Sequence, residues 1–292
     1  GRYPHNSGGE GFFHLRKPGM PILPGLLRSA DYLVGILGKV AHSTPYAEFE
    51  WDMHVDMDQL GMGRNPAVYR QYVEEFVKRS VEANRPFFLM VNSHDPHRPF
   101  YGNDREEWYT IADPPAMRPS RTFTAGDIVT PGHLEDLPDV RLEIAEYYSS
   151  VRRCDDTVGD VLDVVAQAGD DENTIVLFLS DNGMAFPFAK TNCWLHSTRS
   201  PLIVRWPGIV QAGAVNPGHF ISGVDLMPTL LDALGIDHLL ALDGQSFLPL
   251  LHGVPQAGRD IAFTVFHETS AHRRYEMRAV HRSRYGYIFN GW

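Results

Sequence analysis

The chain has 292 residues, of which 43% are hydrophobic and 21% charged, the composition of an ordinary globular protein. This length allows one large domain, or one large domain followed by the start of a small one. The formal net charge of −10 argues against a nucleic-acid partner, because phosphate backbones are bound by basic surfaces. No apolar run approaches the roughly 20 residues that a membrane span needs, so we expect none.

The first clear elements are a helix over 65–84 and a strand over 87–91. Pro66 follows Asn65, a suitable N-cap, and apolar residues then recur with helical spacing. This stripe consists of Tyr69, Val73, Phe76, Val77 and Val81. The run from Phe87 to Val91 is continuously apolar, which is typical of a strand buried on both faces of a parallel sheet.

A long amphipathic helix is predicted over 141–169, with Gly169 as its cap. Its apolar stripe consists of Ile144, Tyr147, Val151, Val158, Leu162 and Val165. Strands follow at 173–180 and 200–208, then a short helix at 224–235 and a strand at 261–267. Strands that alternate with helices predict an α/β fold, with a mostly parallel central sheet and helices on both faces.

Two predicted strands end in polar residues, at the position where open α/β sheets place active sites. "SHDPHRP" carries His94 and His97, and "SDNG" carries Asp181 and Asn182. A carboxylate beside an amide oxygen suits calcium or magnesium, and Lys190 in the next loop could face an anion held by that metal. On these residues alone, Asp-Asn-Gly is as well explained by a turn, and the histidines by a structural role.

A third polar pair, Lys39 and His42, lies in "GILGKVAH", a glycine-flanked loop after a short apolar run. Alone it would be an exposed lysine and a chance histidine. Taken in chain order, however, these motifs resemble the sulfatase family of the alkaline-phosphatase-like superfamily. Gly1-Arg2 is similar to the end of the family's nucleophile motif, and the other elements follow in the family's order up to about Asn290.

Within the family, "HDPHR" and the segment 267–290 resemble the heparan N-sulfatase branch. Two details depart from that branch, which tends to carry arginine at the position of Lys190 and a spacing one residue shorter than that from Lys39 to His42. The longer spacing is similar to that of the iduronate-2-sulfatase type. The resemblance implies hydrolysis of a sulfate ester or sulfamate on a sulfated carbohydrate.

The resemblance also implies a calcium ion and a formylglycine nucleophile made from the Cys or Ser of Cys-x-Pro-Ser-Arg. Asp181 and Asn182 would bind the metal, and Lys39 and Lys190 would bind sulfate oxygens. His97 would face the sulfate or the leaving group, with His94 as the alternative. His42 would be an acid–base group for the nucleophile hydrate.

We expect the nucleophile motif and an Asp-Asp pair of metal ligands to precede Gly1, so that this stretch alone would be inactive. The expected domains are a catalytic domain over 1–258, without its N-terminal part, and the beginning of a C-terminal subdomain over 259–292. The family works mostly in the periplasm, in the lysosome or outside the cell.

Two stretches imitate parts of the site. "MRPSR" at 117–121 has methionine where the nucleophile motif has cysteine, and Asp155-Asp156 follows Cys154 on the long helix. We interpret both as structural. Cys154 and Cys193 could form a bridge or remain buried thiols, and thiols are favoured.

Two alternatives stay open. The first is a phosphoester or phosphonate hydrolase of the same superfamily, which would use a Thr or Ser nucleophile and usually two metals. The single Asp181-Asn182 pair with Lys190 favours sulfate over that chemistry. The second is a carbohydrate-binding relative that kept the fold and lost catalysis.

Overall fold

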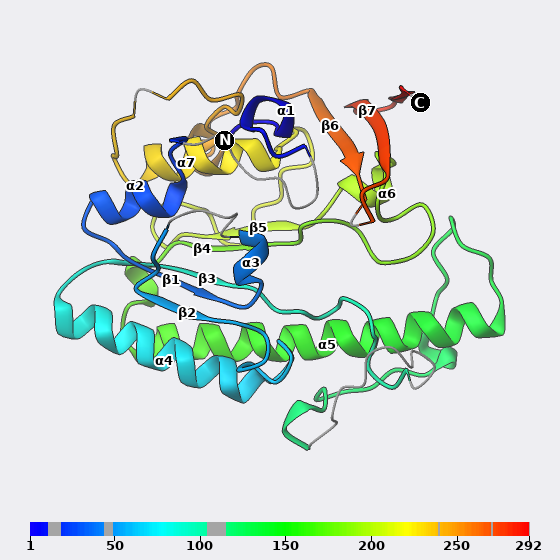
Figure 1. Ribbon diagram of the computed structural model, residues 1–292, viewed down its shortest axis with the longest axis horizontal. Coiled ribbons are helices and arrows are strands. Elements are labelled where there is room, and N and C mark those ends of the chain that lie inside the picture. Colours follow the sequence, from blue (N-terminus) through cyan, green and yellow to red (C-terminus); the bar gives the residue numbers. More distant parts are fainter. Residues whose placement is uncertain (11–18, 44–48, 104–114, 239, 270, 292) are drawn as a thin grey trace. The chain divides into compact units, whose positions relative to one another are not determined.

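The computed structural model describes residues 1–10, 19–43, 49–103, 115–238, 240–269 and 271–291. The chain divides into two compact units. One unit comprises residues 24–171, and the other comprises residues 1–23 together with 172–292. Figure 1 shows the path of the chain.

The unit of residues 24–171 contains a parallel three-stranded sheet in the order β2-β1-β3. Its strands are β1 (Leu33–Leu37), β2 (Met53–Val55) and β3 (Phe87–Val91). All five residues of the central strand β1 are buried, whereas those of β3 are only half-buried. The expectation that 87–91 is buried on both faces is therefore wrong in this unit, because β3 lies at the edge of its sheet.

Helix α4 (Pro66–Ala83) packs against β1 and β3, and helix α5 (Pro138–Gln167) packs alongside α4, as Figure 1 shows. A Cβ added to Gly35 would lie 2.8 Å from side-chain atoms of Leu89 and Phe76, so the helix approaches the sheet closely at this glycine. The core between α4 and the sheet contains Leu33, Leu37, Tyr69, Val73 and Phe76. This packing of an apolar helix face stabilises the parallel sheet.

Both long helices were predicted, but their apolar stripes were wrong in part. Val81 is 61% exposed and Val151 is 40% exposed, although each has the expected spacing. Helix α5 begins at Pro138, earlier than expected, and it buries Arg153. The shorter elements of this unit are most of α2 (Leu23–Ser29), α3 (Val40–Ser43), η1 (Pro115–Met117), η2 (Ala125–Asp127) and the start of η3 (Asp171–Asn173).

The other unit contains strands β4 (Val176–Leu179) and β5 (Leu202–Arg205), which pair antiparallel. Both strands were predicted, and their mutual direction is a finding of the structure. A second sheet joins β6 (Ile261–Glu268), β7 (Arg274–Arg282) and β8 (Gly286–Asn290) in antiparallel order. The helical elements of this unit are α1 (Pro4–Ser7), α6 (Leu195–Thr198), η4 (Gly223–Asp225), α7 (Leu226–Ala233) and α8 (Leu248–Leu251).

The β6-β7-β8 sheet begins near the boundary expected at 258/259. The expected domains, 1–258 and 259–292, differ from the two compact units. The expected domains follow the resemblance to the family, whereas the compact units follow the packing of the folded chain. That domain division therefore stays a prediction.

Candidate active site

The carboxyl ends of β1 and β3 meet at one edge of the parallel sheet, because the two strands are parallel neighbours. β1 is followed by Gly38 and Lys39, and β3 is followed by Asn92. The Asn92 side chain donates a hydrogen bond of 3.0 Å to the Gly38 carbonyl oxygen, and its backbone amide donates one of 2.8 Å to Leu37. These bonds fix the two loops side by side.

Lys39 and the two histidines of the SHDPHRP loop lie close together at this edge. The pKa of His94 is lowered to about 4, first by burial and then by the positive charges of Lys39 and Arg64. Gly63 packs against the His94 ring, and its own φ of +70° favours glycine. His94 is therefore a neutral imidazole near pH 7 and cannot supply a positive charge to an anion there.

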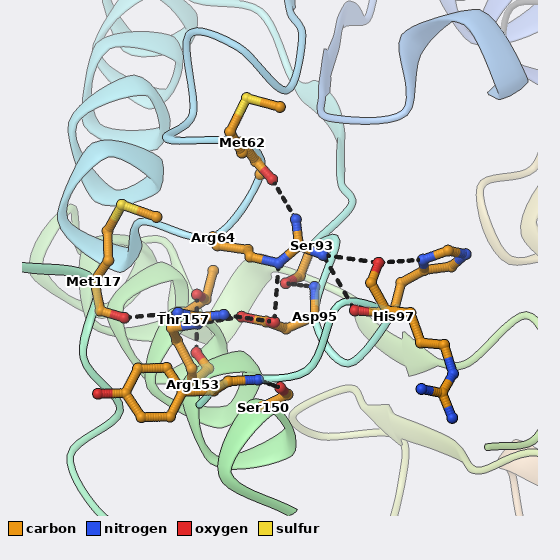
Figure 2. Close-up of polar contacts among 12 residues, drawn as sticks. Met62, Arg64, Ser93, Asp95, His97, Met117, Ser150, Arg153 and Thr157 are labelled. Carbon is orange, nitrogen blue, oxygen red and sulfur yellow. Dashed lines mark hydrogen bonds and ion pairs between the residues drawn. The ribbon is translucent and has the colours of Figure 1, made fainter. Parts of the chain in front are cut away.

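His97 differs from His94 in exposure and orientation. Its side chain is exposed, and Nδ1 lies 2.8 Å from the Arg98 carbonyl oxygen. A carbonyl oxygen only accepts hydrogen bonds, so the proton of this bond belongs to Nδ1. The other ring nitrogen, Nε2, is consequently the one without a proton in the neutral ring. Figure 2 shows this ring beside its carbonyl partner.

Sequence reasoning missed Asp56, which follows β2 and so lies at the carboxyl end of the third parallel strand. Its negative charge raises the pKa of His94, against the larger effect of burial. The short alternation of the "MHVD" segment is the signal that could have placed Asp56 at a strand end. His42, in the short helix α3 just after Lys39, is exposed.

A buried charged cluster beneath the SHDPHRP loop was also missed. Asp95 accepts hydrogen bonds from Arg153, at 2.6 Å from Nε and 3.1 Å from Nη2, and its Oδ1 lies 3.4 Å from Arg64 Nε. All three side chains are at most 4% exposed. The loop that carries His94 and His97 is therefore anchored to α5 and to the segment before α4 (Figure 2).

Asp181 and Asn182 follow β4 in the other unit, as predicted. Among the described residues, neither side chain has a hydrogen-bond or ion-pair partner. Ser180 Oγ donates a 2.8 Å hydrogen bond to the Asn182 carbonyl oxygen, and the Gly183 amide donates one of 3.0 Å to the Ser197 carbonyl oxygen. The backbone is thus fixed while the side-chain oxygens stay available.

Position 183 needs a glycine because of a close contact, and not because the backbone turns sharply there. Its φ is not in the left-handed region. A Cβ at this position would instead collide with the backbone carbonyl oxygens of His196 and Ala189. The loop after Gly183 therefore folds back onto it, and this contact brings Lys190, the neighbour of Ala189, to the Asp-Asn turn.

The donor chemistry of this turn fits a hard cation. An uncommitted carboxylate and an uncommitted amide oxygen would supply two of the six to eight oxygen ligands that calcium takes. Within the described part of the chain, no cluster of three or more His, Cys, Asp or Glu side chains is arranged to hold a metal. Asp181 and Asn182 are thus suitable ligands for such a cation and would supply two of the several that it needs.

The structure brings together Lys39, His94 and His97 in one unit, and Asp181, Asn182 and Lys190 in the other. The assignment of all these residues, with His42, to one active site stays a prediction. Among the helices of the described ranges, none is both long and apolar enough to cross a membrane.

The two stretches that imitate catalytic motifs are structural. Ser120 of "MRPSR" donates hydrogen bonds of 2.7 Å from its amide and 2.6 Å from its hydroxyl to the Asp156 carboxylate. Met117 is buried, and its carbonyl oxygen accepts from Arg153. Cys154 and Cys193 are free thiols, and burial raises the pKa of Cys154 to about 11, so it is no thiolate near pH 7.

The chain is similar to known sulfatases. Residues 1–236 match the sulfatase family, and residues 186–290 match the family described as N-sulphoglucosamine sulphohydrolase, C-terminal. Human N-sulphoglucosamine sulphohydrolase is 31% identical over 291 residues, covering 92% of this chain and 56% of the relative. An endo-4-O-sulfatase of Bacteroides thetaiotaomicron is 30% identical over 184 residues, covering 58% of this chain and 33% of the relative.

Solved structures share the fold. A 2-O GAG sulfatase, BT1596, superposes with a TM-score of 0.71 at 19% identity, covering 99% of this chain and 70% of that one. A phosphonate monoester hydrolase of Silicibacter pomeroyi superposes with a TM-score of 0.61 at 15% identity, covering 99% of this chain and 77% of that one. These confirm the expected alkaline-phosphatase-like α/β fold. The chain spans about half the length, or less, of these two curated relatives. With most of its residues inside the family match, the chain belongs to the sulfatase family.

Proposed function

We propose that this chain is part of a hydrolase that removes sulfate from a sulfated saccharide. The observation that carries the proposal is the cluster of Lys39, His94 and His97 at the carboxyl edge of a parallel sheet, in a chain of the sulfatase family. A sulfate ester or sulfamate is an anion, and its hydrolysis builds further charge on oxygens around sulfur. Fixed cations near that charge lower the barrier.

In this proposal Lys39 and Lys190 bind the sulfate oxygens. His97 presents Nε2 to the leaving group, because Nδ1 already donates to a backbone carbonyl. In its protonated form this nitrogen can give a proton to the departing sugar oxygen or nitrogen, so that cleavage of the S–O or S–N bond leaves a neutral hydroxyl or amine. His94 is less suited to that role because its pKa is low and its ring is partly buried.

Calcium binding belongs to the same proposal. Asp181 and Asn182 would hold the ion, which would supply positive charge to the bound sulfate. A formylglycine hydrate is the proposed nucleophile, with His42 as the acid–base group that serves it. We propose that the protein works in the periplasm, in the lysosome or outside the cell.

The first substrate to test is N-sulfated glucosamine. The support is the match of 186–290 to the N-sulphoglucosamine sulphohydrolase C-terminal family, together with the human relative of that name. The second candidate function is phosphonate or phosphate ester hydrolysis, because a phosphonate monoester hydrolase shares the fold.

The test uses the protein expressed from its complete gene, with and without calcium. Sulfate release from N-sulfated glucosamine and from 6-O-sulfated glucosamine is compared with hydrolysis of a phosphonate monoester. We expect sulfate release that a chelator abolishes. Faster cleavage of the phosphonate would favour the second function, and saccharide binding without turnover would favour a non-catalytic relative.

One variant tests the metal assignment. Asp181→Ala should lower kcat for sulfate release by about 10²- to 10³-fold, the loss typical of removing one charge-stabilising group from an active site. It should also weaken calcium binding in a titration. The matched control is Asp232→Ala, which removes an exposed carboxylate on α7 in the same unit and should change neither quantity. Equal effects of the two variants would refute the assignment.

A further inference from the structure

Arg64 is a fully buried arginine that donates hydrogen bonds to three backbone carbonyl oxygens. Its side chain is 1% exposed. Nη1 donates 2.8 Å to the Met62 carbonyl oxygen, while Nη2 donates 3.1 Å to that of His97 and 3.3 Å to that of Arg98. One guanidinium thus joins the segment before α4 to the SHDPHRP loop (Figure 2).

The Arg98 carbonyl oxygen has a second donor, which is the ring of His97. His97 Nδ1 lies 2.8 Å from it. The same oxygen atom therefore receives both the guanidinium of Arg64 and the imidazole of His97. If this carbonyl turned away, the ring would lose the contact that sets both its proton position and its direction.

We propose that Arg64 is a positioning residue for His97. It holds the Arg98 carbonyl in place, and that carbonyl keeps the proton on His97 Nδ1, so that Nε2 is the unprotonated nitrogen of the neutral ring. The inference rests on the proposed function, because it assigns a use to Nε2. It adds a residue that touches neither substrate nor metal and acts through a single carbonyl oxygen.

The charges of the cluster support this assignment. Asp95 already has a bidentate partner in Arg153, which also donates 2.9 Å to the Met117 carbonyl oxygen. One buried carboxylate thus lies between two buried arginines, and it accepts its hydrogen bonds from Arg153. The carbonyl oxygens of His97 and Arg98 are the groups that Arg64 serves and Arg153 does not.

Asp95 explains how the extra arginine keeps its orientation. Arg64 Nε lies 3.4 Å from Asp95 Oδ1, an ion-pair distance, and this atom makes no hydrogen bond. The carboxylate thus attracts the guanidinium without competing for its two Nη groups. Both Nη groups bind carbonyl oxygens, in the fork geometry that arginine has and lysine lacks.

The first measurement is the tautomer of His97 in the wild-type protein, read from the 15N chemical shifts of its ring. His97→Gln identifies the signals. We expect the neutral ring to carry its proton on Nδ1. A proton on Nε2 would overturn the proposal before any other variant is made, and this readout does not depend on catalysis.

The second measurement compares Arg64→Lys with Arg153→Lys. Both variants keep a positive charge beside Asp95 and replace a buried guanidinium by an ammonium group. Only Arg64→Lys removes the donors to the carbonyl oxygens of His97 and Arg98. We expect Arg64→Lys to give a mixture of His97 tautomers and to lower kcat on the order of 10- to 100-fold, the effect of losing a group that orients a ligating histidine. KM should change much less.

Arg153→Lys should reduce stability while His97 keeps its Nδ1 proton. The inference fails if Arg64→Lys retains the wild-type tautomer, or if both variants shift it equally. If the wild type releases no sulfate from any saccharide tested, the proposed function fails while the tautomer comparison still decides the role of Arg64.

Discussion

The loops that follow β3 and β4 are stabilised in opposite ways. The loop after β3 is anchored by buried charged side chains, with Asp95 between Arg64 and Arg153. The loop after β4 is held by backbone contacts at Gly183, and the Asp181 and Asn182 side chains make no bonds within the described structure. A proton-transferring ring must point in one direction, so its support has to be specific. Oxygen ligands of calcium need only reach the ion, because that cation accepts variable geometry.

The largest effect should come from removing the charge beneath the first loop. Asp95→Ala leaves two buried guanidinium groups without their carboxylate, which should lower the free energy of unfolding by about 3–5 kcal/mol. Urea denaturation measures the change. The matched control is Asp155→Ala on α5, where a 64% exposed carboxylate pairs with Arg152 and should contribute less than about 1 kcal/mol. Similar losses in both variants would mean that the cluster does not anchor this loop.

A smaller effect should follow from changing the backbone contact of the second loop. In Gly183→Ala the new Cβ collides with the carbonyl oxygens of His196 and Ala189, so the loop must move, at a cost of about 1–3 kcal/mol in the free energy of unfolding. Gly159→Ala is the control, since Gly159 lies in the interior of α5 with no atom within 4 Å of the added Cβ. That change should stabilise the protein by about 1 kcal/mol. Stabilisation by both changes would refute the steric role of Gly183.

The smallest effect concerns pH and arises from His94 in the first loop. Burial lowers the pKa of His94 from 6.5 to about 4, so below pH 6.5 the unfolded chain binds a proton that the folded state does not. Stability that is fully present above pH 6.5 should therefore decline as the pH falls toward 4. Because the ring is partly exposed, we expect a loss of only about 1 kcal/mol between pH 7 and pH 5.

His94→Gln is the variant that checks this pH dependence. It removes the titrating ring, so its unfolding free energy should be flatter over the same interval, as measured by urea denaturation at each pH. An unaltered slope in His94→Gln would assign the pH dependence to other groups.

The sequence predicted the strand ends well, for a simple reason. Continuous apolar runs such as Phe87–Val91 stop where polar side chains begin, and parallel neighbours end at the same edge. Lys39 and His94 could therefore be expected together, although 54 residues lie between them in the chain. Asp56 was not predicted, because β2 is only three residues long and its alternation of apolar and polar residues is too short to indicate a strand.

The sequence could not reveal the buried cluster, because a periodic pattern assigns charged residues to the solvent. On α5 that rule placed Val151 inside and gave no reason to bury Arg153, whereas the fold exposes Val151 and buries Arg153 at 3% exposure. The partner that makes this burial possible is Asp95, 58 residues away in the chain. Spacing within one helix contains no information about such a partner.

The sequence by itself determined the family, the order of the motifs and the elements at whose ends the candidate residues lie. These properties depend on local composition and periodicity, which can be read directly from the amino-acid sequence. Only the tertiary structure decided which histidine is exposed, which ring nitrogen of His97 carries the proton and why Gly183 must be glycine. Those properties depend on contacts between distant segments, namely Arg64 with the Arg98 carbonyl, the His94 ring with Gly63, and the His196 carbonyl with Gly183.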